Sequence, residues 1–84
     1  MEDLKNTQEM TLVAEAYTRY RTLLVAYANK RTRNLADAED VVQEAFIKII
    51  NMGDMVYAAT IRNLAFTTVQ NLLIDRLRRR VVVS

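Results

Sequence analysis

The sequence predicts an all-α fold, a compact three-helix bundle-like domain with an irregular loop before the last helix. Its 84 residues include no proline and a single glycine, Gly53, so little in the chain can break a helix or make a tight turn. Apolar residues recur at the three- to four-residue spacing of amphipathic helices. A chain of this length builds one hydrophobic core. We therefore expect one domain, residues 1–84, with helices at about residues 7–30, 36–51 and 63–80.

The first helix is expected to begin after Asn6, because Asn6 and Glu9 have the spacing of a capping box. It should run to about Lys30, where the polar residues 31–34 form a connection. The tyrosines of this helix have the spacing of core residues, so we expect them to pack inside. The whole apolar stripe consists of Val13, Ala16, Tyr17, Tyr20, Leu23, Leu24 and Tyr27.

The second helix is expected to follow Asn34, whose side chain suits an N-cap. Asp37, Glu39 and Asp40 crowd its first turn, where the helix dipole favours negative charge. The helix should end near Asn51. Its apolar positions are Ala38, Val41, Val42, Ala45, Phe46, Ile49 and Ile50.

Around Gly53 the apolar periodicity fails, which predicts a loop from Met52 to about Arg62 with room for a short helical turn at residues 56–60. The third helix then has two distinct faces. Its apolar face consists of Phe66, Val69, Leu73 and Leu77, with Arg80 at the edge. Its opposite face, which we call the polar stripe, consists of Leu64, Thr67, Asn71, Asp75 and Arg78.

The composition argues against an enzyme, a metal site and a membrane span. Without cysteine the chain has no disulfide or thiolate ligand, and without histidine it lacks the commonest metal ligand and the usual general base. We therefore expect no catalysis and no cofactor. Apolar runs such as residues 81–83 are far shorter than the ~20 residues of a membrane helix, and the acidic start Met1-Glu2-Asp3 is unlike a signal peptide. A cytoplasmic protein is expected.

The charges are sorted along the chain, although the net charge is only +2. Such sorting favours two different partners. Arginines at a helix end can simply stabilise the last turn, but the dipole offers only about half a charge, whereas nucleic acid offers one charge per nucleotide. The basic end therefore favours nucleic acid as a partner. The acidic block consists of Asp37, Glu39, Asp40 and Glu44, and the basic end consists of Arg76, Arg78, Arg79 and Arg80.

Asp40, Gln43 and Glu44 have the i, i+3, i+4 spacing that brings side chains together on one helix face, and we call them the acceptor patch. Gln43 and Glu44 lie beyond the first turn, where the benefit of the dipole to acidic groups has faded. The patch suits a basic or amide-rich helical partner. A well-capped helix with a solvated face would carry the same residues.

Three stretches of the sequence are informative together. They are Tyr17-Thr-Arg-Tyr-Arg-Thr-Leu-Leu24, Asp37-Ala-Glu-Asp-Val-Val-Gln-Glu-Ala-Phe46 and Val69-Gln-Asn-Leu-Leu-Ile-Asp-Arg-Leu-Arg-Arg-Arg80. In this order and spacing they resemble region 2 of the extracytoplasmic-function (ECF) sigma factors of bacterial RNA polymerase, members of the sigma-70 family. The second stretch is the most specific, because it matches nearly letter for letter.

The resemblance implies a transcription initiation factor domain that docks on the clamp helices of the largest catalytic subunit of core RNA polymerase. It also implies capture of the non-template strand of the −10 promoter element, and it admits an anti-sigma factor as a partner. The acceptor patch falls on the family's polymerase contact, and Asn71 falls on its base-reading asparagine. The chain departs from the family in two ways. Leu64 and Ala65 stand where a Trp-Leu pair is usual, and no stretch resembles the helix-turn-helix domain that reads the −35 element.

The DNA site is expected on the polar stripe and the loop before it. Asn71 offers both a donor and an acceptor, as reading a base edge requires, although a lone surface asparagine usually binds water. A pocket for an unstacked base is expected between residues 53–62 and Asn71, with Asp75 orienting Asn71 or Arg78. Leu64 removes a stacking platform worth ~1–3 kcal/mol per base, so melting should be weak. The expected DNA contacts are Arg62, Leu64, Thr67, Asn71, Arg76, Arg78, Arg79 and Arg80.

One alternative function stays open, a sigma-like helical module that binds polymerase or an anti-sigma factor without recognising DNA. A duplex-binding helix-turn-helix fits less well. No short glycine-containing turn joins two consecutive helices with a polar recognition helix behind it.

Overall fold

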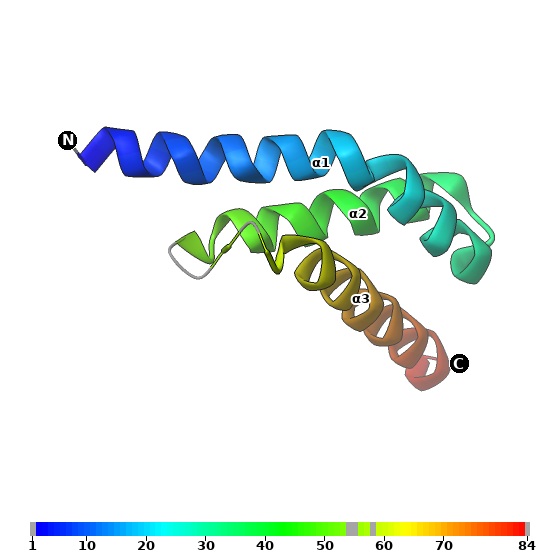
Figure 1. Ribbon diagram of the computed structural model, residues 1–84. Coiled ribbons are helices and arrows are strands. Elements are labelled where there is room, and N and C mark those ends of the chain that lie inside the picture. The colour runs from blue at the N-terminus through cyan, green and yellow to red at the C-terminus, as the bar shows by residue number, and fades with distance from the viewer. Residues whose placement is uncertain (1, 54–55, 58, 84) are drawn as a thin grey trace.

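The computed structural model describes residues 2–53, 56–57 and 59–83, with side chains described only between residues 11 and 79. The described part contains no strand and three helices, α1 (Glu2–Thr32), α2 (Leu35–Ile50) and α3 (Ile61–Val83). Figure 1 shows α1 and α2 running antiparallel side by side, with α3 leaving at an angle to both. The predicted all-α fold is confirmed, including an irregular segment before the last helix. Among the described residues no helix is long and apolar enough to cross a membrane.

The connection between α1 and α2 is a tight turn formed by Arg33 and Asn34. Arg33 has a φ of 55°, in the left-handed region, and its N–H donates to the carbonyl of Asn29 at 2.8 Å, which closes the end of α1. Asn34 is extended, and its Oδ1 accepts a hydrogen bond from the N–H of Asp37 at 3.1 Å. The prediction of Asn34 as the N-cap of the second helix is therefore confirmed.

The expected start of the first helix is wrong. The backbone of α1 is helical from Glu2, so Asn6 and Glu9 lie inside the helix rather than at its end. An N-cap residue has a non-helical backbone, and a residue within α1 cannot fulfil that role. No glycine or proline precedes Asn6, so nothing in the backbone stops the helix from extending further. The start of α3 is also earlier than expected, at Ile61.

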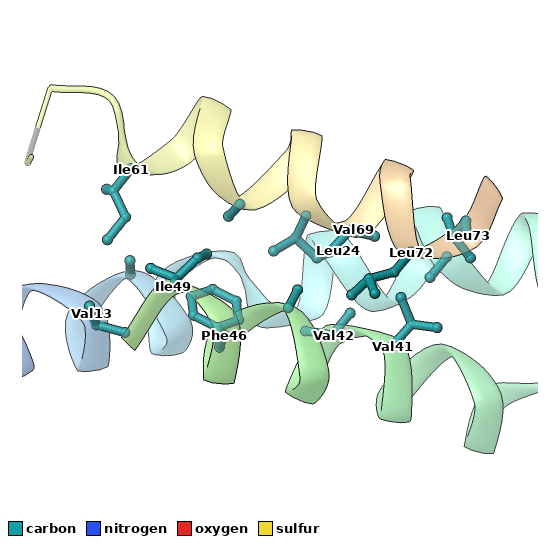
Figure 2. Packing of buried hydrophobic residues seen from close by; sticks show 14 of the residues in the cluster. Val13, Leu24, Val41, Val42, Phe46, Ile49, Ile61, Val69, Leu72 and Leu73 are labelled. Carbon is teal, nitrogen blue, oxygen red and sulfur yellow. The ribbon is translucent and has the colours of Figure 1, made fainter. Parts of the chain in front are cut away.

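The core lies where α2 meets both other helices. Figure 2 shows Phe46, Val42 and Val41 of α2 directed toward Val69 and Leu72 of α3. Alanines at the contacts let the helix backbones approach closely, because they add little volume. The buried residues are Val13, Ala16, Leu24, Ala28, Ala38, Val41, Val42, Ala45, Phe46, Ile49, Val56, Ile61, Ala65, Val69, Leu72 and Leu73.

Three residues predicted in apolar stripes are exposed instead. Leu23, Ile50 and Leu77 are 52 %, 43 % and 50 % exposed. Leu23 and Ile50 lie at the edges of their stripes, whereas Leu77 lies near the middle of its stripe but toward the C-terminal end of α3. The buried Ala28, and Ala65 and Leu72 of α3, were not expected in the core. The spacing of apolar residues predicts which face of a helix points to the core, but the way the helices cross decides which residues of that face are buried.

The aromatic residues join the helices in pairs at the border of the core. Tyr17 of α1 meets Phe46 of α2 edge to face, with ring centroids 5.0 Å apart. Tyr27 of α1 meets Phe66 of α3 in the same way at 5.9 Å. These tyrosines and Tyr20 pack against the core while staying partly exposed, so their predicted core position is confirmed in part. Edge-to-face pairs stabilise a contact beyond the area that they bury.

Replacing Arg33 with glycine should stabilise the domain. Glycine adopts positive φ without a steric penalty, which outweighs its greater freedom in the unfolded chain. We expect the free energy of unfolding to rise by about 0.5 kcal/mol and the Tm by about 2–4 °C, measured by circular dichroism. Arg33→Ala is the control, because it removes the same charge and keeps the strain. A glycine variant no more stable than the alanine variant would show that the turn is not strained.

Candidate functional site

Arg76 of α3 lies against three carboxylates on the exposed side of α2. Its Nη2 donates a hydrogen bond to Oδ2 of Asp40 at 2.6 Å and lies 3.6 Å from Oε2 of Glu44. Its Nη1 lies 3.8 Å from Oδ1 of Asp37. The hydrogen bond to Asp40 is the main reason that the pKa of Arg76 is raised above its usual value, and the other carboxylates act in the same direction. One guanidinium therefore ties the C-terminal half of α3 to α2.

The acceptor patch is brought together as the spacing suggests. Asp40, Gln43 and Glu44 are all exposed on α2, while the apolar residues between them are buried. None of the three contributes a side chain to the core. The sequence pattern placed the patch correctly but missed Arg76 as its neighbour. Arg76 is 36 residues from Asp40 along the chain, so no local spacing reveals the contact.

A second ion pair links α1 to α2 on another side. Nη2 of Arg21 donates to Oε2 of Glu39 at 2.9 Å, and Nε of Arg21 donates to the hydroxyl of Tyr17 at 3.1 Å. The hydrogen bond to Tyr17 is the main cause that raises the pKa of Arg21. Glu39 was expected only to favour the first turn of the helix. It also forms a surface ion pair with α1.

The polar stripe of α3 faces solvent over most of its length. Thr67, Asn71 and Arg78 are exposed, and they are four and seven residues apart, close to one and two turns. Leu64 differs, because it is partly buried and packs against the core. Among the described side chains, no hydrogen bond or ion pair joins Asp75 to Asn71 or Arg78. The orienting role expected for Asp75 is thus not formed in this structure.

The arginines expected at DNA do not all lie on this stripe. Arg78 and Arg79 are exposed, and the side chain of Arg80 lies outside the described residues. Arg76 is turned toward the carboxylates of α2. Arg62 lies nine residues before Asn71, about two and a half turns, and therefore on the opposite side of α3. There its guanidinium is 6.0 Å from the ring centre of Phe66.

The sequence pattern also missed Tyr57, an exposed aromatic residue just before α3. Its side chain is 62 % exposed, the highest value among the large apolar side chains described. Its carbonyl accepts hydrogen bonds from the N–H groups of Thr60 and Ile61 at 3.1 and 2.9 Å, so the turn leading into α3 holds it. Tyr57, Leu64, Asn71 and Arg78 recur every seven residues. Because α3 begins only at Ile61, the helical repeat does not fix the direction of Tyr57.

A shallow cavity of about 760 Å³ lies between α1 and the start of α3, not at Asn71. Leu12, Ala16, Tyr20 and Ile61 form part of its lining. The pocket expected between the loop and Asn71 cannot be described as a whole, because residues 54, 55 and 58 lie outside the described part. Within the described residues, no group of acidic side chains is placed to hold a metal ion.

Residues 16–81 match the model of the family named sigma-70 region 2. The match covers most of the chain, which therefore belongs to this family of transcription initiation domains. Region 2 of the sigma-70 family is a non-enzymatic domain that binds core RNA polymerase and recognises the −10 element of promoter DNA. No curated protein and no solved structure matched the chain.

Proposed function

We propose that the chain is region 2 of a bacterial ECF sigma factor, which acts in the cytoplasm and captures the non-template strand of the −10 element once polymerase is bound. The acceptor patch docks on the clamp helices of the largest catalytic subunit. The observation that carries this assignment is the exposure of Asp40, Gln43 and Glu44 on a helix whose other face is fully used by the core. Nothing in the packing of the domain requires Gln43, so a partner is the better explanation of the patch.

On α3, Thr67, Asn71, Arg78 and Arg79 form the proposed DNA surface, with Arg80 beside them in sequence. Asn71 reads a base edge through its donor and acceptor, and the arginines hold phosphates. Arg76 and Arg62 do not belong to this surface in the free domain, because one binds the carboxylates of α2 and the other lies over Phe66. The mechanism is capture, in which an unstacked base is held so that melted DNA is favoured over duplex.

Leu64 stands where the family usually has tryptophan, and it is partly buried. We infer that Tyr57 supplies part of the missing aromatic surface, since it is exposed and held at the entrance to α3. Stacking on an aromatic ring contributes ~1–3 kcal/mol per base. With only one such ring, melting by this domain should be weak.

A second function is favoured by the same departure at Leu64. A domain without the aromatic platform can act as a protein-binding module, with polymerase or an anti-sigma factor as its partner and no role for DNA. The acceptor patch serves both functions, so only DNA measurements separate them.

Replacing Gln43 with alanine and Glu44 with glutamine should abolish pull-down of core RNA polymerase. These side chains are exposed, so the free energy of unfolding should change by less than about 0.5 kcal/mol. The control is Glu15→Gln with Gln70→Ala, which makes the same chemical changes at exposed positions of α1 and α3. Retained binding by the patch variant would move the polymerase contact elsewhere, and equal loss of folding would make the patch structural.

Removing arginines and removing Asn71 should have different effects on binding of single-stranded −10 DNA. The double variant Arg78→Ala, Arg79→Ala should flatten the slope of log affinity against log salt by roughly 1.4 at most, and weaken matched and scrambled strands alike. Asn71→Ala should leave the slope intact and cost on the order of 1–3 kcal/mol on the matched strand only. Salt titrations with core polymerase present measure both.

The matched control for Asn71 is the adjacent exposed amide, Gln70, whose side chain points a quarter turn away. Gln70→Ala should bind both strands as the unchanged chain does. If Asn71→Ala weakens both strands equally, Asn71 does not read a base, and the protein-binding alternative gains support.

Aromatic substitutions test the proposed stacking surface. Tyr57→Ala should weaken single-strand binding and Tyr57→Phe should not, because stacking requires the ring and not the hydroxyl. Leu64→Trp should strengthen binding, by at most the ~1–3 kcal/mol of one stacked base. Fluorescence anisotropy of a labelled strand gives the affinities, and circular dichroism checks the fold. Equal binding by Tyr57→Ala and Tyr57→Phe would remove Tyr57 from the DNA surface.

A further inference from the structure

The proposed polymerase contact is already occupied from within the free domain. Asp40 and Glu44 belong to the acceptor patch, and both lie within ion-pair distance of Arg76. The Asp40 side chain remains 65 % exposed and that of Glu44 48 % exposed, so a partner can reach them. The side chain of Arg76 is less exposed, at 29 %. A donor from a partner would therefore approach carboxylates that Arg76 already pairs with, Asp40 through a hydrogen bond and Glu44 through an ion pair at 3.6 Å.

We propose that Arg76 is an internal competitor for the polymerase. When the polymerase binds, its donors replace the guanidinium at Asp40 and Glu44, and Arg76 is released. This inference rests on the proposed function of the acceptor patch. Carboxylate oxygens accept bonds from cations and N–H groups, so the replacing groups on the polymerase are of the same chemical kind as Arg76.

The competition must be mild for the domain to work. Ion pairs at a protein surface are weak, and displacing one lowers the affinity of a competing partner by only about two- to fivefold. In the free domain Arg76 offsets the mutual repulsion of Asp37, Asp40 and Glu44, which lie around it. When Arg76 is released, the ion pairs between α2 and the part of α3 that carries Arg78 and Arg79 are lost. Binding at one helix is thereby linked to the helix proposed to hold DNA.

The test is the affinity of the chain for core polymerase, measured by titration at fixed salt. Arg76→Gln should bind about two- to fivefold more tightly than the unchanged chain, because the carboxylates are no longer paired. Arg21→Gln is the matched control. It makes the same change in charge and breaks a comparable interhelical ion pair, that with Glu39, which lies outside the acceptor patch. Its affinity should stay within the error of the unchanged chain.

A variant of the acceptor patch itself shows whether the gain in polymerase affinity arises there. In a chain carrying Asp40→Asn alone, which keeps Gln43 and Glu44 for the polymerase, the further change Arg76→Gln should tighten binding less than it does in the unchanged chain. Arg76→Lys is a control for a folding defect, because it keeps the positive charge and loses only the forked geometry of the guanidinium. Its affinity for polymerase should lie between those of the unchanged chain and Arg76→Gln. Circular dichroism of every variant confirms that the helices persist.

The outcomes separate this inference from the function on which it rests. If the unchanged chain does not bind polymerase, both are overturned. If the chain binds through Asp40 and Glu44 but Arg76→Gln binds no more tightly, the competition is overturned and the polymerase contact stands. Weaker binding by a folded Arg76→Gln would instead make Arg76 a contact to the polymerase.

Discussion

One apolar stripe of α2 supports the whole domain, because it packs against α1 and α3 at the same time. None of its buried residues is more than 3 % exposed. Phe46 reaches the ring of Tyr17 on one side, while Val41 and Val42 meet α3 on the other. A chain of this length has no second core that could compensate for a defect here. The exposed side of α2 carries the polar residues of the acceptor patch together with exposed apolar residues such as Ile47.

The same constraint separates the two proposed interaction surfaces. Helices that pack through their apolar faces turn their polar faces away from each other, so the acceptor patch of α2 and the polar stripe of α3 cannot merge into one site. A partner protein and a DNA strand can therefore be held together without competing for the same side chains. Among the described side chains, Arg76 reaches from α3, the helix proposed to bind DNA, to the patch. It provides a physical link between two otherwise independent surfaces.

Local sequence signals predicted the elements that depend on local chemistry. The N-cap at Asn34 and the buried stripe of the second helix follow from side-chain type and spacing alone, and both are as expected except that Ile50 is exposed. The predicted start of the first helix was too late. A capping-box pattern does not by itself begin a helix, and a helix can run through it when no glycine or proline precedes it. Leu23 and Ile50 were misplaced, since burial at the edge of a stripe depends on how the helices cross. The contacts of Arg76 and the exposure of Tyr57 depend on the tertiary structure, and the residue spacing within one helix does not predict them.

Two interhelical ion pairs with similar geometry in the free domain have different meanings once a partner is considered. Arg21 binds Glu39 at 2.9 Å and Arg76 binds Asp40 at 2.6 Å, both at the surface, where such pairs add little to stability. Stability therefore does not explain why either arginine is present. The pair with Glu39 lies outside the acceptor patch, so a polymerase docked on the patch, as proposed, would leave it intact. The pair with Asp40 lies within the patch and cannot keep its geometry when another donor takes the carboxylate. In the proposed competition this weak interaction matters through its position, because the partner and Arg76 compete for the same carboxylates.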